Sequence, residues 1–237
     1  MKDETIVITI NGKTLTATRD ETILDVAWAN DIDIPRLCFL KGLSSVGACR
    51  LCMVEVAGVP RLLAACVTRV TDGMEVTTDS PRLQSHRKMI VELLFAERNH
   101  ICAFCVSSGH CELQDLAQKL GITHIRYPYR FPEETVDATH SRFVHDPNRC
   151  VLCTRCVRAC GEIEGARTWN VKNRSILSRV MTDMDQPWGE SPTCTSCGKC
   201  VQACPTGALA EKGCATGENV KTPSIFPHLA SMRDARM

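Results

Sequence analysis

Two runs of cysteines decide the fold: Cys150-Val-Leu-Cys153-Thr-Arg-Cys156-Val-Arg-Ala-Cys160 and Cys194-Thr-Ser-Cys197-Gly-Lys-Cys200-Val-Gln-Ala-Cys204-Pro205. Both have the spacing C-x2-C-x2-C-x3-C, and the second run closes on Cys-Pro. A single run of this kind is compatible with chance or with a zinc site. Two runs with the same spacing form the most specific pattern in the chain, and the C-terminal half is organised around them.

This spacing is typical of two-cluster bacterial ferredoxins, in which the fourth cysteine of each run binds the other [4Fe–4S] cluster. Three cysteines surround one corner of a cluster, and the fourth lies on the following turn, closer to the other cluster. We predict that one cluster is bound by Cys150, Cys153, Cys156 and Cys204. The other is predicted to be bound by Cys160, Cys194, Cys197 and Cys200.

The composition supports metal binding. Cysteine is the outlier at 16 residues, whereas aromatic residues make up 5%. The sequence starts without an apolar signal region, and no apolar run approaches the roughly 18 residues of a membrane span. We therefore expect a cytoplasmic protein with no membrane span, whose reduced cysteines bind metal. A net charge of +1, with both signs mixed, gives no support for nucleic acid as a partner.

The N-terminal region alternates strand and helix patterns. Residues 5–18 contain two β-branched runs around Asn11-Gly12, which predicts a hairpin with a type I′ turn. Residues 23–29 have helical periodicity, with a cap near Asp20 or Thr22. A cysteine-bearing loop and two short strands around Gly58 follow. This order of elements resembles the β-grasp ferredoxin fold.

Four cysteines of this region form another ligand set: Cys38, Cys49, Cys52 and Cys66. Their spacing, C-x10-C-x2-C-x13-C, has a longer first gap than that of plant-type [2Fe–2S] ferredoxins. It resembles the N-terminal [2Fe–2S] domain of the large iron–sulfur subunit of complex I and of iron-only hydrogenases. The alternative is a zinc ion bound by four cysteines, although a zinc ribbon more often has two C-x2-C knuckles. We predict a [2Fe–2S] cluster.

A third motif follows a helix predicted over residues 81–98. Cys102, Cys105 and Cys111 have the spacing C-x2-C-x5-C, which is one ligand short for a [4Fe–4S] cluster. The same two families carry a [4Fe–4S] site with one histidine and three cysteines at this spacing, followed by Glu-Leu-Gln as here. The resemblance therefore implies a histidine ligand.

The position of that histidine departs from the family pattern. The relatives typically have it four residues before the first cysteine, where this chain has Arg98. We predict that His100 is the ligand, with His110 as the alternative. A histidine ligand is neutral when bound, so it would link the site to pH.

The remaining segments are predicted to connect and pack these sites. A helix after Cys111 is expected to stop at Gly121, and residues 161–190 form an insert with Trp169 and Trp188 as packing anchors. After Lys212 we expect a polar tail, in which Cys214 is a free thiol. Four arginines are expected on a solvated or docking face: Arg142, Arg149, Arg155 and Arg158.

The predicted fold class is α+β, in four parts. Residues 1–80 form the N-terminal β-grasp [2Fe–2S] ferredoxin domain. Residues 81–140 form a small helical [4Fe–4S] domain, with one histidine and three cysteine ligands, and a connector. Residues 141–213 form the bacterial-type two-[4Fe–4S] ferredoxin domain, and residues 214–237 form the C-terminal tail.

The ligand count closes on four clusters. With Cys214 left out, 15 cysteines and one histidine supply 16 ligands, four for each of one [2Fe–2S] and three [4Fe–4S] clusters. Four clusters in so short a chain must lie near one another, which predicts an electron relay. The chain has no G-x-G-x-x-G motif in a βαβ unit and no P-loop, so we predict no catalytic residue and no nucleotide site in it.

Over residues 5–212, the chain resembles the small diaphorase (iron–sulfur) subunit of NAD(P)-linked bidirectional nickel–iron hydrogenases. The resemblance rests on the four cluster motifs and on Glu-Arg-Asn-His-Ile-Cys at 97–102. It implies a partner diaphorase subunit with FMN and NAD(P), and hydrogenase small and large subunits with a nickel–iron site. The chain would carry electrons between them, as part of an oxidoreductase that couples reversible H2 oxidation to NAD(P)+ reduction.

Two other functions stay open. One is an electron-transfer subunit of an NAD-dependent formate dehydrogenase or a complex I-like enzyme, which predicts the same clusters but other partners. The other is a structural zinc protein, which predicts zinc in place of iron and sulfide.

Overall fold

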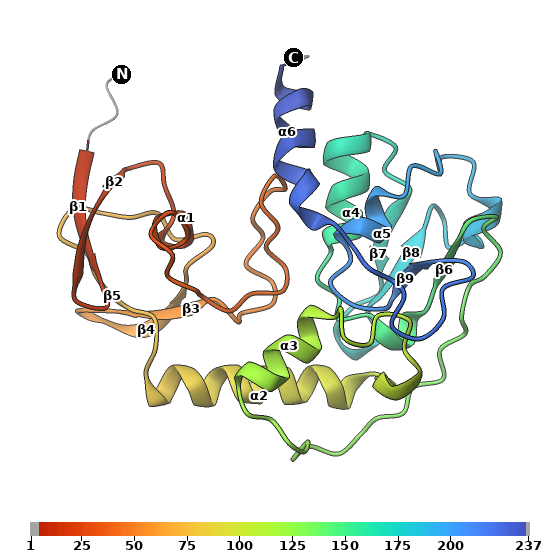
Figure 1. Cartoon of the computed structure of the whole chain (residues 1–237), viewed down its shortest axis with the longest axis horizontal. Coiled ribbons are helices and arrows are strands. Elements are labelled where there is room, and N and C mark those ends of the chain that lie inside the picture. The colour runs from red at the N-terminus through yellow and green to blue at the C-terminus, as the bar shows by residue number, and fades with distance from the viewer. Residues whose placement is uncertain (1–4, 236–237) are drawn as a thin grey trace. The chain divides into compact units, whose positions relative to one another are not determined.

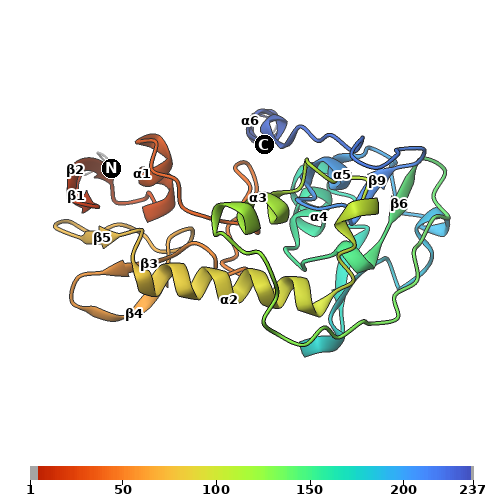
Figure 2. The same cartoon turned by 60° about the horizontal axis from the view of Figure 1, so that its bottom comes forward.

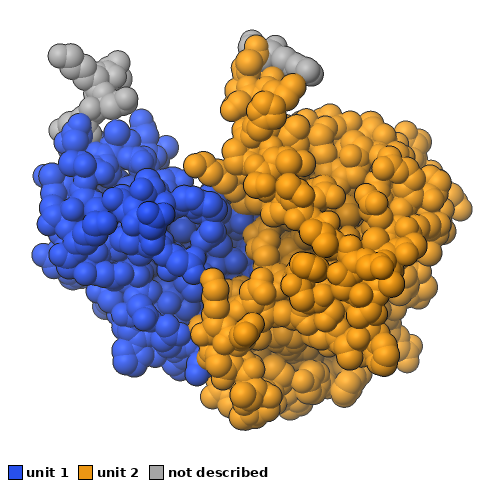
Figure 3. Space-filling view, viewed as in Figure 1, with its two compact units in different colours: residues 1–39, 45–90 blue, residues 40–44, 91–237 orange. Residues whose placement is uncertain are grey.

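The computed structural model describes residues 5–235 of the chain. It forms two compact units, which Figure 3 shows in different colours. The first unit comprises residues 1–39 and 45–90, and the second comprises residues 40–44 and 91–237. Helix α2 (Pro81–Glu97), as predicted, begins in the first unit and ends in the second.

A five-stranded mixed sheet forms the first unit (Figure 1). Its strands are β1 (Thr5–Ile10), β2 (Lys13–Thr18), β3 (Met53–Val56), β4 (Val59–Ala64) and β5 (Glu75–Thr77), in the order β2-β1-β5-β3-β4. β1 and β5 are parallel, and the other neighbours are antiparallel. The predicted hairpin is confirmed: Asn11 and Gly12 join β1 to β2 with the positive φ angles of a type I′ turn.

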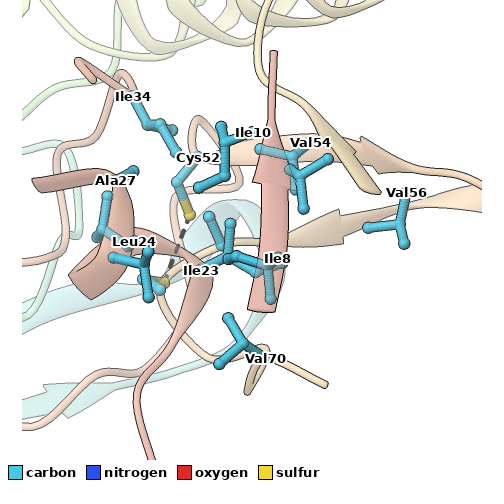
Figure 4. Close-up of a cluster of buried hydrophobic side chains, with 14 of the residues drawn as sticks. Ile8, Ile10, Ile23, Leu24, Ala27, Ile34, Cys52, Val54, Val56 and Val70 are labelled. Carbon is cyan, nitrogen blue, oxygen red and sulfur yellow. Dashed lines mark hydrogen bonds between the residues drawn. The ribbon is translucent and has the colours of Figure 1, made fainter. Parts of the chain in front are cut away.

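Helix α1 (Ile23–Ala29) shares its core with this sheet. It begins at Thr22, whose side chain and that of Asp25 each accept the other's backbone N–H, forming a capping box. Figure 4 shows Ile23 and Leu24 of the helix packed with Ile8 of β1, with the Cys52 side chain in the same cluster. The sheet, helix and cysteine loop predicted for this region are therefore confirmed.

The second unit consists of short helices and two small antiparallel sheets. Its helices are α3 (Glu112–Lys119), α4 (Arg155–Arg158), the π-helical segment η3 (Ala159–Glu164), α5 (Lys199–Ala203) and α6 (Phe226–Asp234). β6 (Phe143–His145) pairs with β9 (Leu209–Glu211), and β7 (Trp169–Lys172) pairs with β8 (Arg179–Thr182). Single 3-10 turns are η1 (Cys102–Phe104), η2 (Pro147–Arg149), η4 (Ser175–Leu177), η5 (Trp188–Glu190) and η6 (Pro223–Ile225). The mixture of strands and helices confirms the α+β class.

Aromatic side chains form the core of the C-terminal region. Trp169 and Trp188 are buried, as predicted for packing anchors, and their rings meet edge to face with centroids 4.8 Å apart. Trp188 also stacks on Phe143 of β6 at 5.4 Å. Figure 2 shows β6 and β9 side by side, close to α4 and α5, which carry ligand cysteines. The core is therefore packed directly against the cysteine runs.

The C-terminal segment is more ordered than the predicted polar tail. Helix α6 begins at Phe226, which is fully buried with Leu43, Ala159 and Ala203. Pro227 lies in the first turn of the helix, where the missing N–H has no helical partner to lose. Only one strongly apolar residue of the helix is buried, so its periodicity was too weak to predict.

The expectation of an exposed arginine face is wrong for two of the four residues. Arg155 and Arg158 are buried. Arg155 donates to both carboxylate oxygens of Glu112 at 2.5 and 2.8 Å, and Arg158 donates to the carbonyl oxygens of Ser44 and Cys153. Their partners come from distant parts of the sequence, which the arginine spacing could not indicate. Among residues 5–235, no helix is both long and apolar enough to cross a membrane.

Candidate iron–sulfur sites

The first predicted ligand set lies in the first unit. Cys52 immediately precedes β3 and Cys66 follows β4, and their Sγ atoms are 3.4 Å apart (Figure 4). The N–H of Cys49 donates to Cys38 Sγ at 3.5 Å. Cys38, Cys52 and Cys66 are buried, and Cys49 is half-buried. All four predicted [2Fe–2S] ligands therefore lie in one site.

The four thiols share protons unequally. Hydrogen bonds from Cys49 and Cys66 lower the pKa of Cys38 to about 2, and a hydrogen bond from Cys66 lowers the pKa of Cys52 to about 7. The pKa values of Cys49 and Cys66 are raised, first of all by their hydrogen bonds to Cys38. Because the thiolate is the metal-binding form of cysteine, this loop holds part of its ligand set ready for iron.

The second set lies in the second unit, where His100, Cys102, Cys105 and Cys111 line one pocket. Cys102 begins η1, Cys105 follows that turn, and Cys111 is the N-cap residue of α3. The backbone of Gly207 closes the pocket tightly, because a Cβ atom there would lie 2.5 Å from Cys105 Sγ. The structure brings together the three cysteines and the histidine that we predicted.

His100 has the properties of a ligand that lacks its metal. The residue is buried, and its Nε2 has no hydrogen-bond partner among residues 5–235. Burial, helped by the charges of Arg149 and Arg98, lowers the pKa of His100 to about 4, so the imidazole is neutral. A buried polar atom without a partner is costly, and a metal bond would satisfy it. His110 is exposed and lies outside this pocket.

Arg98, at the position where the family has its histidine, belongs to an ion-pair network. Its guanidinium donates to Glu134 Oε1 at 2.5 Å and to the carbonyl oxygen of Ser178 at 2.8 Å. Arg179 donates to the same carboxylate oxygen at 2.9 Å. Arg98 therefore ties the connector to the segment before β8.

The third set, Cys150, Cys153, Cys156 and Cys204, lines a separate pocket. Burial raises the pKa of Cys150 to about 12 and that of Cys153 to about 11. Cys204 also experiences burial, but the charge of Lys221 and hydrogen bonds from the segment around Thr206 outweigh it and lower its pKa. Lys221 Nζ donates to the carbonyl oxygen of Cys204 at 2.9 Å. The C-terminal segment thus places a cation beside this set.

The fourth set is Cys160, Cys194, Cys197 and Cys200. Cys160 lies in η3, Cys200 lies in α5, and the other two lie on the loop before α5. The pKa of Cys200 is raised mainly by burial and further by the charges of the other three cysteines, so the four lie close together. Cys197 is exposed whereas Cys160 and Cys200 are buried. This set therefore reaches the surface of the second unit.

Two nitrogen donors that we did not predict face Cys194. Trp188 Nε1–H donates to its Sγ at 3.3 Å, and His140 Nε2 lies 3.8 Å from the same sulfur. His140 Nδ1 accepts the backbone N–H groups of Arg142 and Phe143 at 3.0 and 3.2 Å. The proton of the neutral ring must therefore be on Nε2, which makes Nε2 a donor. Nothing in the spacing of these residues indicates that they meet.

The second and third sets are neighbours. Thr206, two residues after Cys204, lines both of their pockets. The N–H of Glu112, next to Cys111, donates to the carbonyl oxygen of Pro205 at 3.0 Å. One short segment of chain therefore separates the two sets.

These donor sets fit iron–sulfur clusters by their chemistry. Within residues 5–235, no three His, Cys, Asp or Glu side chains converge on a position for a single metal ion. A [4Fe–4S] cluster makes a different demand, because each iron takes one protein ligand. Each set offers four cysteines, or three with a neutral histidine, in a mostly buried setting. Cys214 is half-buried and belongs to none of them.

Three families match successive parts of the chain. Residues 3–81 match the 2Fe-2S iron-sulfur cluster binding domain. Residues 87–126 match the NADH-ubiquinone oxidoreductase-G iron-sulfur binding region, and residues 141–210 match the ferredoxin-like domain of NADH-quinone oxidoreductase subunit 3. Each match covers cysteine motifs described above, and the prediction of both [2Fe–2S] and [4Fe–4S] binding regions is confirmed.

The full-length comparison decides the family. The chain is 38% identical over 208 residues to the NAD-reducing hydrogenase HoxS subunit gamma of Cupriavidus necator, covering 87% of each protein. The chain belongs to the HoxS gamma subunit family. A crystal structure of an NAD+-reducing [NiFe]-hydrogenase in the H2-reduced state contains a chain that matches with a TM-score of 0.84 at 34% identity, covering 89% of this chain and 88% of that one. The resemblance predicted from the cysteine motifs is confirmed.

Larger oxidoreductases share the same segment. The chain is 40% identical over 207 residues to the NADPH-Fe(3+) oxidoreductase subunit alpha of Geobacter sulfurreducens, covering 87% of this chain and 24% of that protein. This HoxS gamma family member therefore spans about a quarter of that relative's length. Its iron–sulfur regions are common to several kinds of oxidoreductase.

Proposed function

We propose that this chain is the iron–sulfur electron-transfer subunit of an NAD(P)-linked nickel–iron hydrogenase in the cytoplasm. It holds one [2Fe–2S] cluster through Cys38, Cys49, Cys52 and Cys66. It holds three [4Fe–4S] clusters through His100, Cys102, Cys105 and Cys111; through Cys150, Cys153, Cys156 and Cys204; and through Cys160, Cys194, Cys197 and Cys200. The proposed domains are residues 1–80, 81–140 and 141–213, with a C-terminal tail at 214–237.

The observation that carries this proposal is the contact between ligand sets. Thr206 lines the pockets of the second and third sets, and Cys156 and Cys200 of the third and fourth sets are close enough to raise the pKa of Cys156. Neighbouring clusters can pass single electrons, whereas a structural metal site has no need of neighbours. The exposed Cys197 offers a route between the last set and a partner.

The partners follow from the family. A diaphorase subunit with FMN and NAD(P) would exchange electrons with one end of the relay, and the small and large hydrogenase subunits with the other. The residues of this chain hold the clusters, bury most of the sulfur atoms and supply N–H groups to some of them. Bound clusters supply the one-electron redox chemistry.

The test is anaerobic purification of the tagged chain from its own organism, with metal and sulfide analysis. We expect about 14 irons and as many acid-labile sulfides per chain, if each predicted set holds its cluster. We also expect nickel and FMN to co-purify, and NAD(P)H to reduce the chain. Stoichiometric zinc without sulfide would overturn the electron-transfer function altogether.

A second candidate is an electron-transfer subunit of a formate dehydrogenase or a complex I-like enzyme. It is favoured by the 40% identity to the larger Geobacter sulfurreducens oxidoreductase and by the match to the NADH-ubiquinone oxidoreductase-G region. The same purification separates the two candidates, because both predict full iron content. Molybdenum or quinone-reducing activity in the complex, without nickel, would favour the second.

A further inference from the structure

A buried cation lies beside the first ligand set. Arg87 is in the part of α2 that belongs to the first unit, and only 2% of the residue is exposed. Its guanidinium makes three hydrogen bonds, all to backbone carbonyl oxygens: Nε to Leu51 at 3.3 Å, and Nη2 to Met53 at 3.1 Å and to Thr78 at 2.8 Å. An arginine stays protonated in proteins, so this is a full positive charge inside the domain.

The hydrogen bonds hold both neighbours of a ligand. Leu51 and Met53 are the residues on either side of Cys52, and Arg87 donates to the carbonyl oxygens of both. The guanidinium is thereby fixed against the backbone that presents the Cys52 thiolate. Thr78 attaches the same group to the end of β5, so the geometry depends on three separate segments.

No carboxylate satisfies this charge at close range. Within residues 5–235 Arg87 forms no ion pair; Asp79 and Asp33 act on it only through their more distant charges, and both are exposed to solvent. A buried charge is normally paired, because leaving it unpaired in the interior is costly. Burial accordingly lowers the pKa of Arg87. The group that would balance this charge is a buried anion near Cys52.

We propose that Arg87 is the buried countercharge of the [2Fe–2S] cluster and raises its reduction potential. This inference rests on the [2Fe–2S] assignment proposed above. Four thiolates around a two-iron, two-sulfide core carry net negative charge, and reduction adds one more electron to it. A fixed cation stabilises the reduced state more than the oxidised state, so removing the cation lowers the potential.

Substitutions of Arg87 separate charge from shape. Arg87→Gln removes the charge and keeps an amide donor, whereas Arg87→Lys keeps the charge in a different shape. Arg82→Gln is the matched control, since Arg82 lies on the same helix, is exposed and also donates to a backbone carbonyl, that of Pro60. The measurement is an anaerobic redox titration of the full chain, in which the electron paramagnetic resonance signal of the [2Fe–2S] cluster is followed.

Arg87→Gln should lower the reduced-to-oxidised ratio at a given potential at least tenfold, which is a shift of 59 mV for a one-electron couple. Arg87→Lys should shift the ratio much less, and Arg82→Gln should leave it unchanged. The [4Fe–4S] signals of the same samples serve as an internal reference and should keep their midpoints. An unshifted Arg87→Gln cluster, or equal shifts in Arg87→Gln and Arg87→Lys, would overturn the proposal.

Iron content covers the case in which Arg87→Gln does not retain its cluster. Loss of about two irons from Arg87→Gln but not from Arg87→Lys would support the charge requirement. Equal loss from both variants would overturn it and leave Arg87 as a structural clamp. If the unmodified chain gives no [2Fe–2S] signal at all, the cluster assignment itself fails, and the role of Arg87 fails with it.

Discussion

The indole N–H of Trp188 donates a hydrogen bond to Cys194 Sγ at 3.3 Å. Hydrogen bonds to cluster sulfurs raise the reduction potential, because the sulfurs carry more negative charge in the reduced state. Trp188→Phe removes this donor and keeps an aromatic ring in the stack. We expect the fourth cluster to become harder to reduce by about 60 mV, equivalent to about 1.4 kcal/mol for a one-electron couple. A redox titration monitored by electron paramagnetic resonance measures the shift.

Phe143→Leu is the control for packing, since Phe143 stacks on Trp188 and has no polar hydrogen. It should disturb the same aromatic core and leave the potential of the fourth cluster in place. Equal shifts in Trp188→Phe and Phe143→Leu would mean that packing, and not the N–H donor, controls the potential.

Replacing each candidate histidine tests the second set. His100→Ala should remove one cluster and lower the iron content by about four atoms, because three cysteines leave one iron without a protein ligand. His110→Ala should keep the full content, since His110 is exposed. Iron and sulfide analysis of the two variants decides between them. Loss of four irons from His110→Ala alone would show that the assignment is reversed.

The cysteine ligands could be predicted because cluster geometry imposes a spacing on neighbouring residues of the sequence. That regularity identified the set of Cys150 and the fold around Cys38, and it reached His100 by its nearness to Cys102. Arg87 and Trp188 had no such signal. Each reaches its cysteine from a separate element, and only the packed fold shows that Arg87 flanks Cys52 and that Trp188 meets Cys194.

The ion pair of Arg98 and Glu134 should be important for stability. Both side chains are only 4% exposed, and Arg179 shares the same carboxylate oxygen. Glu134→Gln leaves the charge of Arg98 buried without a carboxylate, so we expect a loss of about 3–5 kcal/mol in the free energy of unfolding. Urea denaturation measures this loss.

A more exposed pair provides the comparison. Glu55 lies 3.6 Å from Arg82, with 29% and 57% of their side chains exposed. Glu55→Gln should therefore cost no more than about 1 kcal/mol. A cost below about 1 kcal/mol for Glu134→Gln as well would argue that the Arg98 charge finds water or another partner once the carboxylate is gone.

Phe226 should hold the C-terminal helix in place. It is fully buried, and it packs so close to residue 42 that a Cβ atom on Gly42 would lie 2.5 Å from the Phe226 carbonyl oxygen. Phe226→Ala should cost about 3 kcal/mol or more, which corresponds to an over hundredfold faster hydrogen exchange of the α6 amides. Gly42→Ala should also loosen the helix, because the new methyl group meets backbone atoms. Met232→Ala on the same helix removes a side chain that is 42% exposed and should change exchange little. If α6 exchanges equally fast in Phe226→Ala and in the unmodified chain, Phe226 does not anchor the helix.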